Sequence, residues 1–171
     1  MPEVPEGMMQ HDKPVDDVFK SDEQLYRRVP HAYWDDDYVN MDAIDLPDMS
    51  VNRGKYSLPQ WVRLISEECR DWGVIGFQVG DIPADMQHLG VHLFRFRPKH
   101  VPHKYNYPHS EVQAFYSKAD APAAEEHIDN EFIKRERLLN LETLFPDDLQ
   151  LRWREQLRRK CRIIIKAYHH S

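Results

Sequence analysis

The order of its apolar segments is the feature that most constrains the fold of this chain. Short segments with strand-like character come first, and longer segments with apolar residues three or four apart come last. A doubly wound fold would need regular strand–helix alternation and a glycine-rich first turn, and the sequence has neither. The order therefore predicts the α+β class: a small, mainly antiparallel sheet, one helix after the second strand and two C-terminal helices.

The expected elements follow from local patterns. The strands are expected at 23–29, 50–57, 73–79, 91–97 and 110–117. A helix is expected to start at Ser57, which has capping-box spacing to Gln60, with Pro59 in its first turn. The two C-terminal helices are expected to begin near Asp120 and Pro146. The last has an apolar stripe of Leu149, Trp153, Leu157, Cys161, Ile164 and Tyr168.

Charge and composition suggest three parts. Residues 1–21 are rich in Pro, Met and acidic side chains and are expected to form an acidic, flexible N-terminal tail. Residues 22–119 would form the α+β core, and residues 120–171 a C-terminal helical pair with a basic last helix. The net charge is −6, but residues 1–48 hold 13 acidic and 4 basic residues, whereas residues 131–171 hold 6 and 10. The two ends could attract each other, or the basic end could meet an acidic partner.

Nothing in the sequence predicts a membrane-spanning segment or an exported protein. No apolar run approaches the roughly 20 residues that span a bilayer, and the first residues lack the pattern of a secretory signal. We expect a cytoplasmic protein whose two cysteines, Cys69 and Cys161, are thiols. Neither belongs to a CxxC pair, so a cysteine-based zinc site is not supported.

The histidine-rich segment "RPKHVPHKYNYPHSEV" (97–112) permits two interpretations. His100, His103 and His109, with Glu111 or His92, could hold zinc in a metal-dependent hydrolase, but the segment lacks any familiar ligand spacing. Alternatively, its three prolines stiffen a connection between two strands, and its polar side chains satisfy the backbone. The sequence predicts neither a bound metal nor a cofactor.

Three motifs carry a family resemblance. "LYRRV" (25–29), "MSVNR" (49–53) and "NYPHSEV" (106–112) occur in this order. The chain thereby resembles a diffuse family of small, uncharacterised bacterial proteins with LYRRV, LSVDR and NPAHA motifs, over about residues 24–112. The resemblance implies a bacterial source and a core that brings Arg, Ser and His positions together. It carries no activity.

The same order of Arg, Ser and Glu resembles ADP-ribosyltransferase-like NAD-using sites. That resemblance implies that Arg27 or Arg28 holds a pyrophosphate, Ser50 a ribose and Glu111 a developing cation, with Tyr56 as a stacking ring. The candidate catalytic residues of such a small enzyme are Arg28, Ser50, Arg53, His109 and Glu111. Arg28, Arg53, His109 and Glu111 are expected around one concavity. In the alternative, the arginines pair with nearby aspartates and Ser50 caps a turn.

The C-terminal helix is the second candidate surface. Seven Lys/Arg residues lie between 152 and 166, and the apolar stripe beside them is long for a small sheet to cover. The predicted partner-binding residues are Arg158, Arg159, Arg162, Ile164, Ile165 and Tyr168. We expect them to contact a protein partner or a second copy, and nucleic acid is less favoured. The leading hypothesis is therefore a bacterial accessory or interaction module that acts with a larger protein, and the small enzyme is the alternative.

Overall fold

The computed structural model describes residues 4–138 and 147–168, which form an α+β fold with a large antiparallel sheet. The strands of this sheet are β1 (Gln24–Val29), β4 (Asp48–Arg53), β5 (Gly73–Gln78), β6 (Asp85–His88), β7 (His92–His100), β8 (His109–Lys118), β9 (Glu126–Ile128) and β10 (Arg162–Ile165). Their order is β10-β5-β1-β4-β8-β7-β6, and β9 pairs with β8. A separate ribbon pairs β2 (Trp34–Asp35) with β3 (Tyr38–Val39).

The described helices are two α-helices and several short 3-10 helices. The α-helices are α1 (Asn130–Leu138) and α2 (Asp147–Lys160). The 3-10 helices are η1 (Glu6–Met8), η2 (His31–Tyr33), η3 (Met41–Ala43), η4 (Pro59–Ile65), η5 (Glu67–Cys69) and η6 (Val79–Asp81). No helix in the described ranges is both long and apolar enough to cross a bilayer.

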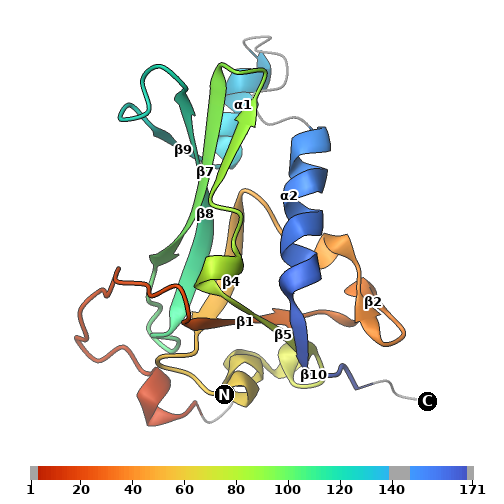
Figure 1. Cartoon of the computed structure of the whole chain (residues 1–171). Coiled ribbons are helices and arrows are strands. Elements are labelled where there is room, and N and C mark those ends of the chain that lie inside the picture. The colour runs from red at the N-terminus through yellow and green to blue at the C-terminus, as the bar shows by residue number, and fades with distance from the viewer. Residues whose placement is uncertain (1–3, 139–146, 169–171) are drawn as a thin grey trace.

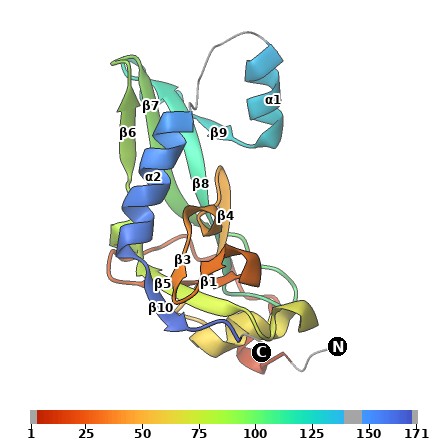
Figure 2. The ribbon, with the colours of Figure 1, turned by 90° about the vertical axis from the view of Figure 1, so that its right-hand side faces the viewer.

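The core lies between the sheet and α2. In Figure 1 the long β7–β8 hairpin runs alongside α2, and Figure 2 shows α2 lying along the same strands from a second direction. Leu149, Trp153 and Leu157 are fully buried from the helix side. The Trp153 ring lies 4.7 Å from that of Phe96 between centroids, and its Nε1 donates to the carbonyl of Pro83 at 3.0 Å. The four-residue spacing of the stripe thus marks the face that packs on the sheet.

The α+β class is confirmed, but the prediction of a small sheet is wrong. The expected strands became β1, β4, β5, β7 and β8 with small shifts, while β6, β9 and β10 were missed. The single helix expected after the second strand is instead the 3-10 helix η4, and Ser57 does not cap it, because its hydroxyl donates to the carbonyl of Leu58.

The first C-terminal helix begins later than predicted, and the last one ends earlier. Residues 126–128 form β9, and α1 begins only at Asn130, where the Asp129 carboxylate accepts from the backbone N–H of Phe132 at 2.7 Å. The last helix ends at Lys160, and Arg162–Ile165 form β10 against β5. Three consecutive isoleucines favour an extended edge strand over a helix, because β-branched side chains pack well on a pleated surface. Ile164 and Tyr168 are therefore not part of a helical stripe.

The N-terminal segment packs on the sheet in the described residues. Met8 is fully buried, and the carbonyl of Pro14 accepts a hydrogen bond from the hydroxyl of Tyr107 at 2.7 Å. The carbonyl of Val18 accepts from the Arg53 guanidinium at 2.7 Å. These contacts hold residues 8–18 against the strands. The predicted flexibility of residues 1–21 concerns motion in solution and stays a prediction.

Removal of the Trp153 ring should weaken the whole fold. We expect Trp153→Ala to lower the free energy of unfolding by about 3–5 kcal/mol, because it empties a fully buried site and removes the hydrogen bond to Pro83. Leu151→Ala on the same helix is the matched control, since Leu151 is 52% exposed, and should change it by less than about 0.5 kcal/mol. Urea denaturation followed by circular dichroism measures both. Equal effects would contradict the packing described for α2.

Candidate functional site

A pocket opens where strands β1 and β4 part. The two strands are paired at Leu25–Arg53 and Tyr26–Asn52, whereas β1 stays paired with β5 along its whole length. Beyond Tyr26, hydrogen bonds from the side chain of Arg27 replace the backbone ladder between β1 and β4. Its Nη1 donates to the carbonyl of Ser50 at 2.8 Å and its Nε to the carbonyl of Ala43 at 2.7 Å. The splayed strands therefore leave a hollow without leaving these two carbonyls unsatisfied.

The pocket has a volume of about 410 Å³ and a mixed lining. Its sheet side is formed by Tyr26, Arg28, Ser50, Asn52 and His109. Its other walls include Val62, Ile65, Trp72, His103, Asn106 and Tyr33. Aromatic walls with a few polar groups are typical of small-molecule sites.

His109 and Ser50 form the polar pair at the centre of this site. The Nε2 atom of His109 lies 3.4 Å from the hydroxyl oxygen of Ser50, and its Nδ1 lies 2.7 Å from the carbonyl oxygen of Val101. A carbonyl can only accept, so Nδ1 carries the proton and Nε2 presents its lone pair to Ser50. The imidazole is thus oriented with its basic nitrogen toward the serine.

The surroundings of His109 favour its neutral form. Burial lowers the pKa of His109 below its ordinary value, and the neighbouring His103 and Arg28 lower it further. Only the hydrogen bond to Val101 and the charge of Glu111 act in the opposite direction. The ring of His103 stacks on that of His109, with centroids 3.9 Å apart. At neutral pH the site therefore holds an uncharged imidazole.

Arg28 lines the pocket and has a buried donor without a partner. Its Nη1 atom is buried and has no hydrogen-bond partner among the described residues. The Nε atoms of Arg63, Arg97 and Arg154 share this property, but none of these three residues lines the pocket. A guanidinium carries a permanent positive charge, so a buried free N–H is costly unless it meets an anion or another acceptor.

A reciprocal amide pair fixes the rim of the pocket. The side chains of Asn52 and Asn106 donate to each other at 2.8 and 2.9 Å, and both are buried. The pair joins β4 to the turn that carries His103. Sequence reasoning missed both asparagines, although "NYPHSEV" and "MSVNR", which contain them, were the motifs that drew attention to Ser50 and His109.

Arg53 lies outside this pocket, so the expectation that it shares a concavity with His109 is wrong. Asn52 pairs with His109 across β4 and β8, and Arg53, one residue further, points to the opposite face. There it is fully buried and bonds the Glu23 carboxylate at 2.6 and 2.8 Å. Its Nη1 also donates to the carbonyl of Asp16. Arg53 joins the N-terminal segment to the sheet.

Asp16 completes that junction. Its carboxylate accepts hydrogen bonds from Lys55 and Tyr56, and these, together with the charge of Arg53, hold the pKa of Asp16 well below its usual range. The Tyr56 ring lies against His100 and Tyr107, with centroids 6.1 and 5.0 Å away. Tyr56 therefore belongs to this junction, away from the pocket lining, where the resemblance to NAD-using sites would have needed it.

Glu111 lies beside the pocket without lining it. It is the cross-strand partner of Ser50, and its Oε2 accepts from the side chain of Gln113 at 3.0 Å. Of the five predicted catalytic residues, the structure brings Arg28, Ser50 and His109 together in one lining, sets Glu111 next to it and separates Arg53. Their catalytic roles remain predictions.

The three histidines of segment 97–112 have different environments and partners. His100 is buried, accepts from the backbone N–H of Asp16 at Nδ1 and donates from Nε2 to the carbonyl of Tyr107. His103 is exposed and stacks on His109. Within residues 4–138 and 147–168, no group of three or more His, Cys, Asp or Glu side chains is arranged to hold a metal ion. The expectation of a metal-free protein stays a prediction.

The cysteines offer no alternative nucleophile. Cys69 and Cys161 are both free, and neither lines the pocket. Burial raises the pKa of Cys161 to about 12, so its thiol stays protonated at neutral pH.

The predicted partner-binding residues lie on α2, on β10 and, for Tyr168, after the end of β10. Arg158 and Arg159 both bond Glu155, and Arg162 donates to the side chain of Gln24 at 2.6 Å. Ile164 packs over Gly76, where a side chain on the glycine would approach it to about 3.0 Å. Ile165 is half-buried and Tyr168 is 59% exposed.

Comparison with known proteins adds no relative. No family model matches the chain, no curated protein resembles it significantly, and no solved structure does either. The bacterial family resemblance therefore stays a prediction. The role of the pocket is inferred from its geometry alone.

The protonation state of His109 can be measured directly. We expect its imidazole to titrate below the ordinary value of 6.5, with the proton of the neutral form on Nδ1. Because the folded-state pKa is lowered, the unfolded chain binds more protons below about pH 6.5, so this histidine destabilises the fold as the pH falls. Nitrogen-15 NMR of the ring reports both properties. A midpoint at or above 6.5, or a proton on Nε2 in the neutral ring, would contradict the geometry.

Proposed function

We propose that this pocket binds a small anionic molecule. The observation that carries the proposal is the guanidinium of Arg28, which lines the pocket and whose buried Nη1 has no acceptor among the described residues. Charge-assisted hydrogen bonds from a guanidinium to a carboxylate or phosphate are among the strongest polar contacts in proteins. A bound anion would supply the missing acceptor, and the two arginines that line the pocket, Arg27 and Arg28, outnumber its one lining carboxylate, that of Asp45.

The other lining residues support a ligand with a flat, partly apolar body. Tyr26, Tyr33 and Trp72 contribute aromatic walls, and Val62 and Ile65 contribute aliphatic ones. A volume of about 410 Å³ falls within the range of small-molecule sites. Ser50, Asn52 and Asn106 offer further hydrogen-bonding groups at the lining, although the two amides already bond each other. The proposal thus favours the small-enzyme hypothesis over a purely structural role for these side chains.

Calorimetry with benzoate tests the proposal. We expect benzoate and phenyl phosphate to bind measurably and benzamide, which lacks the charge, to bind at least tenfold more weakly. Arg28→Gln should weaken benzoate binding at least tenfold, which corresponds to about 1.4 kcal/mol. Arg97→Gln is the matched control, since Arg97 also has a buried, unpartnered Nε but lies away from the pocket. It should bind benzoate like the unmodified chain.

Two outcomes would count against the anion pocket. Equal binding of benzoate and benzamide would show that charge plays no part. Unchanged benzoate binding by a folded Arg28→Gln protein would show that the anion sits elsewhere.

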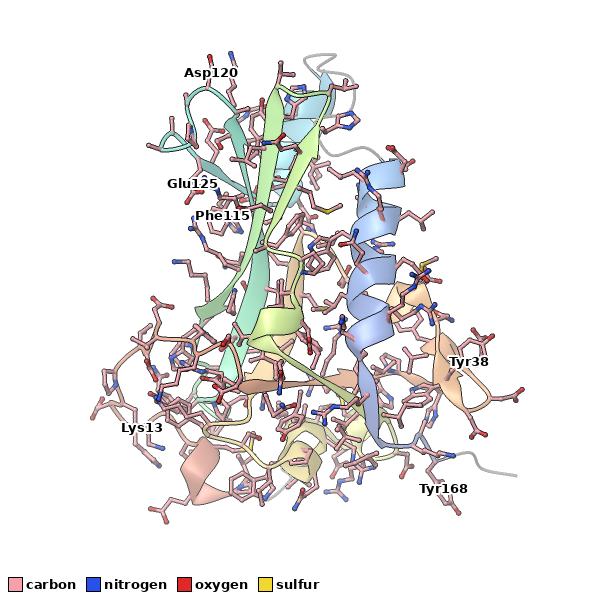
Figure 3. The ribbon with its side chains drawn as sticks, viewed as in Figure 1. Lys13, Tyr38, Phe115, Asp120, Glu125 and Tyr168 are labelled. Atoms are coloured by element: carbon pink, nitrogen blue, oxygen red, sulfur yellow. The ribbon has the colours of Figure 1, made fainter. Side chains whose placement is uncertain are left out.

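The interaction-module hypothesis keeps one supporting observation, at the β10 edge. Tyr38 and Ile163 are 58% and 39% exposed and border a small hollow of about 100 Å³ together with Arg158 and Arg162. Figure 3 shows the labelled Tyr38 and Tyr168 on the same side of the molecule. Exposed aromatic and aliphatic side chains beside arginines are typical of protein interfaces. We propose a second copy of the chain as the simplest occupant, and a larger partner stays a prediction.

Light scattering over a range of concentrations tests self-association through this edge. We expect the mass of the unmodified chain to rise above that of a monomer and Ile163→Asp to stay monomeric, because a buried aspartate at an interface is costly. Leu89→Asp, at a site that is 77% exposed on the β6–β7 turn, should associate like the unmodified chain. A monomer at every concentration would contradict association between copies.

A further inference from the structure

We infer that Ser50 is a nucleophile activated by His109, and that the pocket cleaves or transfers the acyl group of a small anionic ester. The inference rests on the proposed anion pocket, with Arg28 as the binding group. It goes further by assigning a reaction to the pair of side chains beside that group.

The hydroxyl of Ser50 is accessible and has a base in reach. Ser50 is exposed on β4 and lines the pocket, so a substrate can approach its oxygen from the hollow. The distance of 3.4 Å to Nε2 of His109 is longer than a tight hydrogen bond. Nucleophile–base contacts are often this loose before a substrate is bound.

His109 has the three properties that a general base needs. The carbonyl of Val101 fixes the proton on Nδ1 and the orientation of the ring, as a carboxylate does in other serine enzymes. Burial and neighbouring positive charge keep the ring neutral at pH 7. The stacked ring of His103 covers its other face, which restricts the ring to this position.

The first chemical step balances with the groups present. The Oγ of Ser50 attacks the ester carbonyl carbon as its proton passes to Nε2 of His109. The C=O π bond breaks, and the negative charge moves to the carbonyl oxygen. The carbonyl π bond then re-forms as the C–O bond to the alcohol breaks, the alcohol takes the proton from His109, and the acyl group stays on Ser50.

The second step restores the protein. Water attacks the acyl carbon and gives a proton to His109. The bond to Ser50 breaks, and the proton returns to Oγ. Another alcohol in place of water would give transfer instead of hydrolysis. Arg28 lines the same pocket and can hold the anionic end of the substrate throughout both steps.

Covalent labelling tests the nucleophile without knowledge of the substrate. The probe is an alkyl fluorophosphonate, in which Ser50 Oγ forms a bond to phosphorus and fluoride leaves, while the serine proton passes through His109 to solvent. We expect one adduct per chain by intact mass spectrometry, located at Ser50 by peptide sequencing. Ser50→Ala should abolish it. His109→Gln should slow labelling by about 100-fold or more, as expected for loss of a general base.

A matched serine and a pH profile control for indirect effects. Ser110 is buried on the opposite face of β8, next to His109 in sequence, and Ser110→Ala should label like the unmodified chain. The labelling rate of the unmodified chain should rise with pH and level off above a midpoint below 6.5. In His109→Gln this dependence should vanish, which a merely structural role of His109 would not produce. Circular dichroism confirms that each variant is folded.

The outcomes separate this inference from the anion pocket. Absence of an adduct at Ser50, or an adduct that persists in Ser50→Ala, overturns the nucleophile, whether or not benzoate binds. Labelling at Ser50 that depends on His109 supports it even if calorimetry finds no benzoate binding, in which case only the anion pocket fails. A rate with no dependence on pH in the unmodified chain would remove His109 as the base.

Discussion

The register of β8 against β4 is the constraint on which the site depends. β8 pairs with three strands, β4, β7 and β9, and its side chains alternate between the core and the pocket side. Ser110, Val112 and Ala114 point into the buried face, which leaves His109 and Glu111 on the other. A shift of one residue would exchange these two sets and bury the imidazole in the apolar core. The hydrophobic alternation that folds the sheet therefore also sets His109 beside Ser50.

A second constraint is the buried charge of Arg53. Removing a guanidinium from water is costly. Here the cost is offset by the Glu23 carboxylate, two backbone carbonyls and the ring of Phe19, which lies 3.9 Å from the guanidinium carbon. Loss of Glu23 alone would leave the charge with one carboxylate, that of Asp16, 3.4 Å from Nη1. Arg53 is thus one of the residues that hold the N-terminal segment, and it lies at the end of β4 just beyond the pocket.

Local pattern predicted much of the sheet and little of its surroundings. The segments around Leu25, Val51, Phe77, Phe94 and Val112 show strand character in the sequence, and each lies in a strand. The run Ile163–Ile165 was predicted to be helical, because Ile164 continues the apolar stripe of the last helix. The same isoleucines also fit a β-strand, and the local pattern does not distinguish the two structures. The 3-10 helix η4 was misread because Pro59 and Gln60 satisfy the rules for the start of either type of helix. Whether such a segment forms a 3-10 helix or an α-helix depends on what it packs against. A local pattern does not contain that information.

For the site, sequence order identified Arg28, Ser50 and His109 but included Arg53 with them. Successive side chains of a strand point to opposite faces of the sheet. Asn52 lies on the same face as His109, so Arg53 lies on the other face. The parting of β1 from β4 depends on Arg27 reaching two carbonyls on other segments, which is information from distant parts of the chain. The amide pair of Asn52 and Asn106, 54 positions apart, is equally invisible to a local reading.

The irregular edge at β10 has a consequence for how copies of this chain can meet. Its pairing with β5 shifts register between Ile163 and Ile165, so the ladder is irregular there. An irregular strand of four residues is a poor template for a continuous ladder of hydrogen bonds with another chain. Open-ended stacking of sheets is thereby discouraged at this edge. Any association here would be made by side chains and not by a continued backbone ladder.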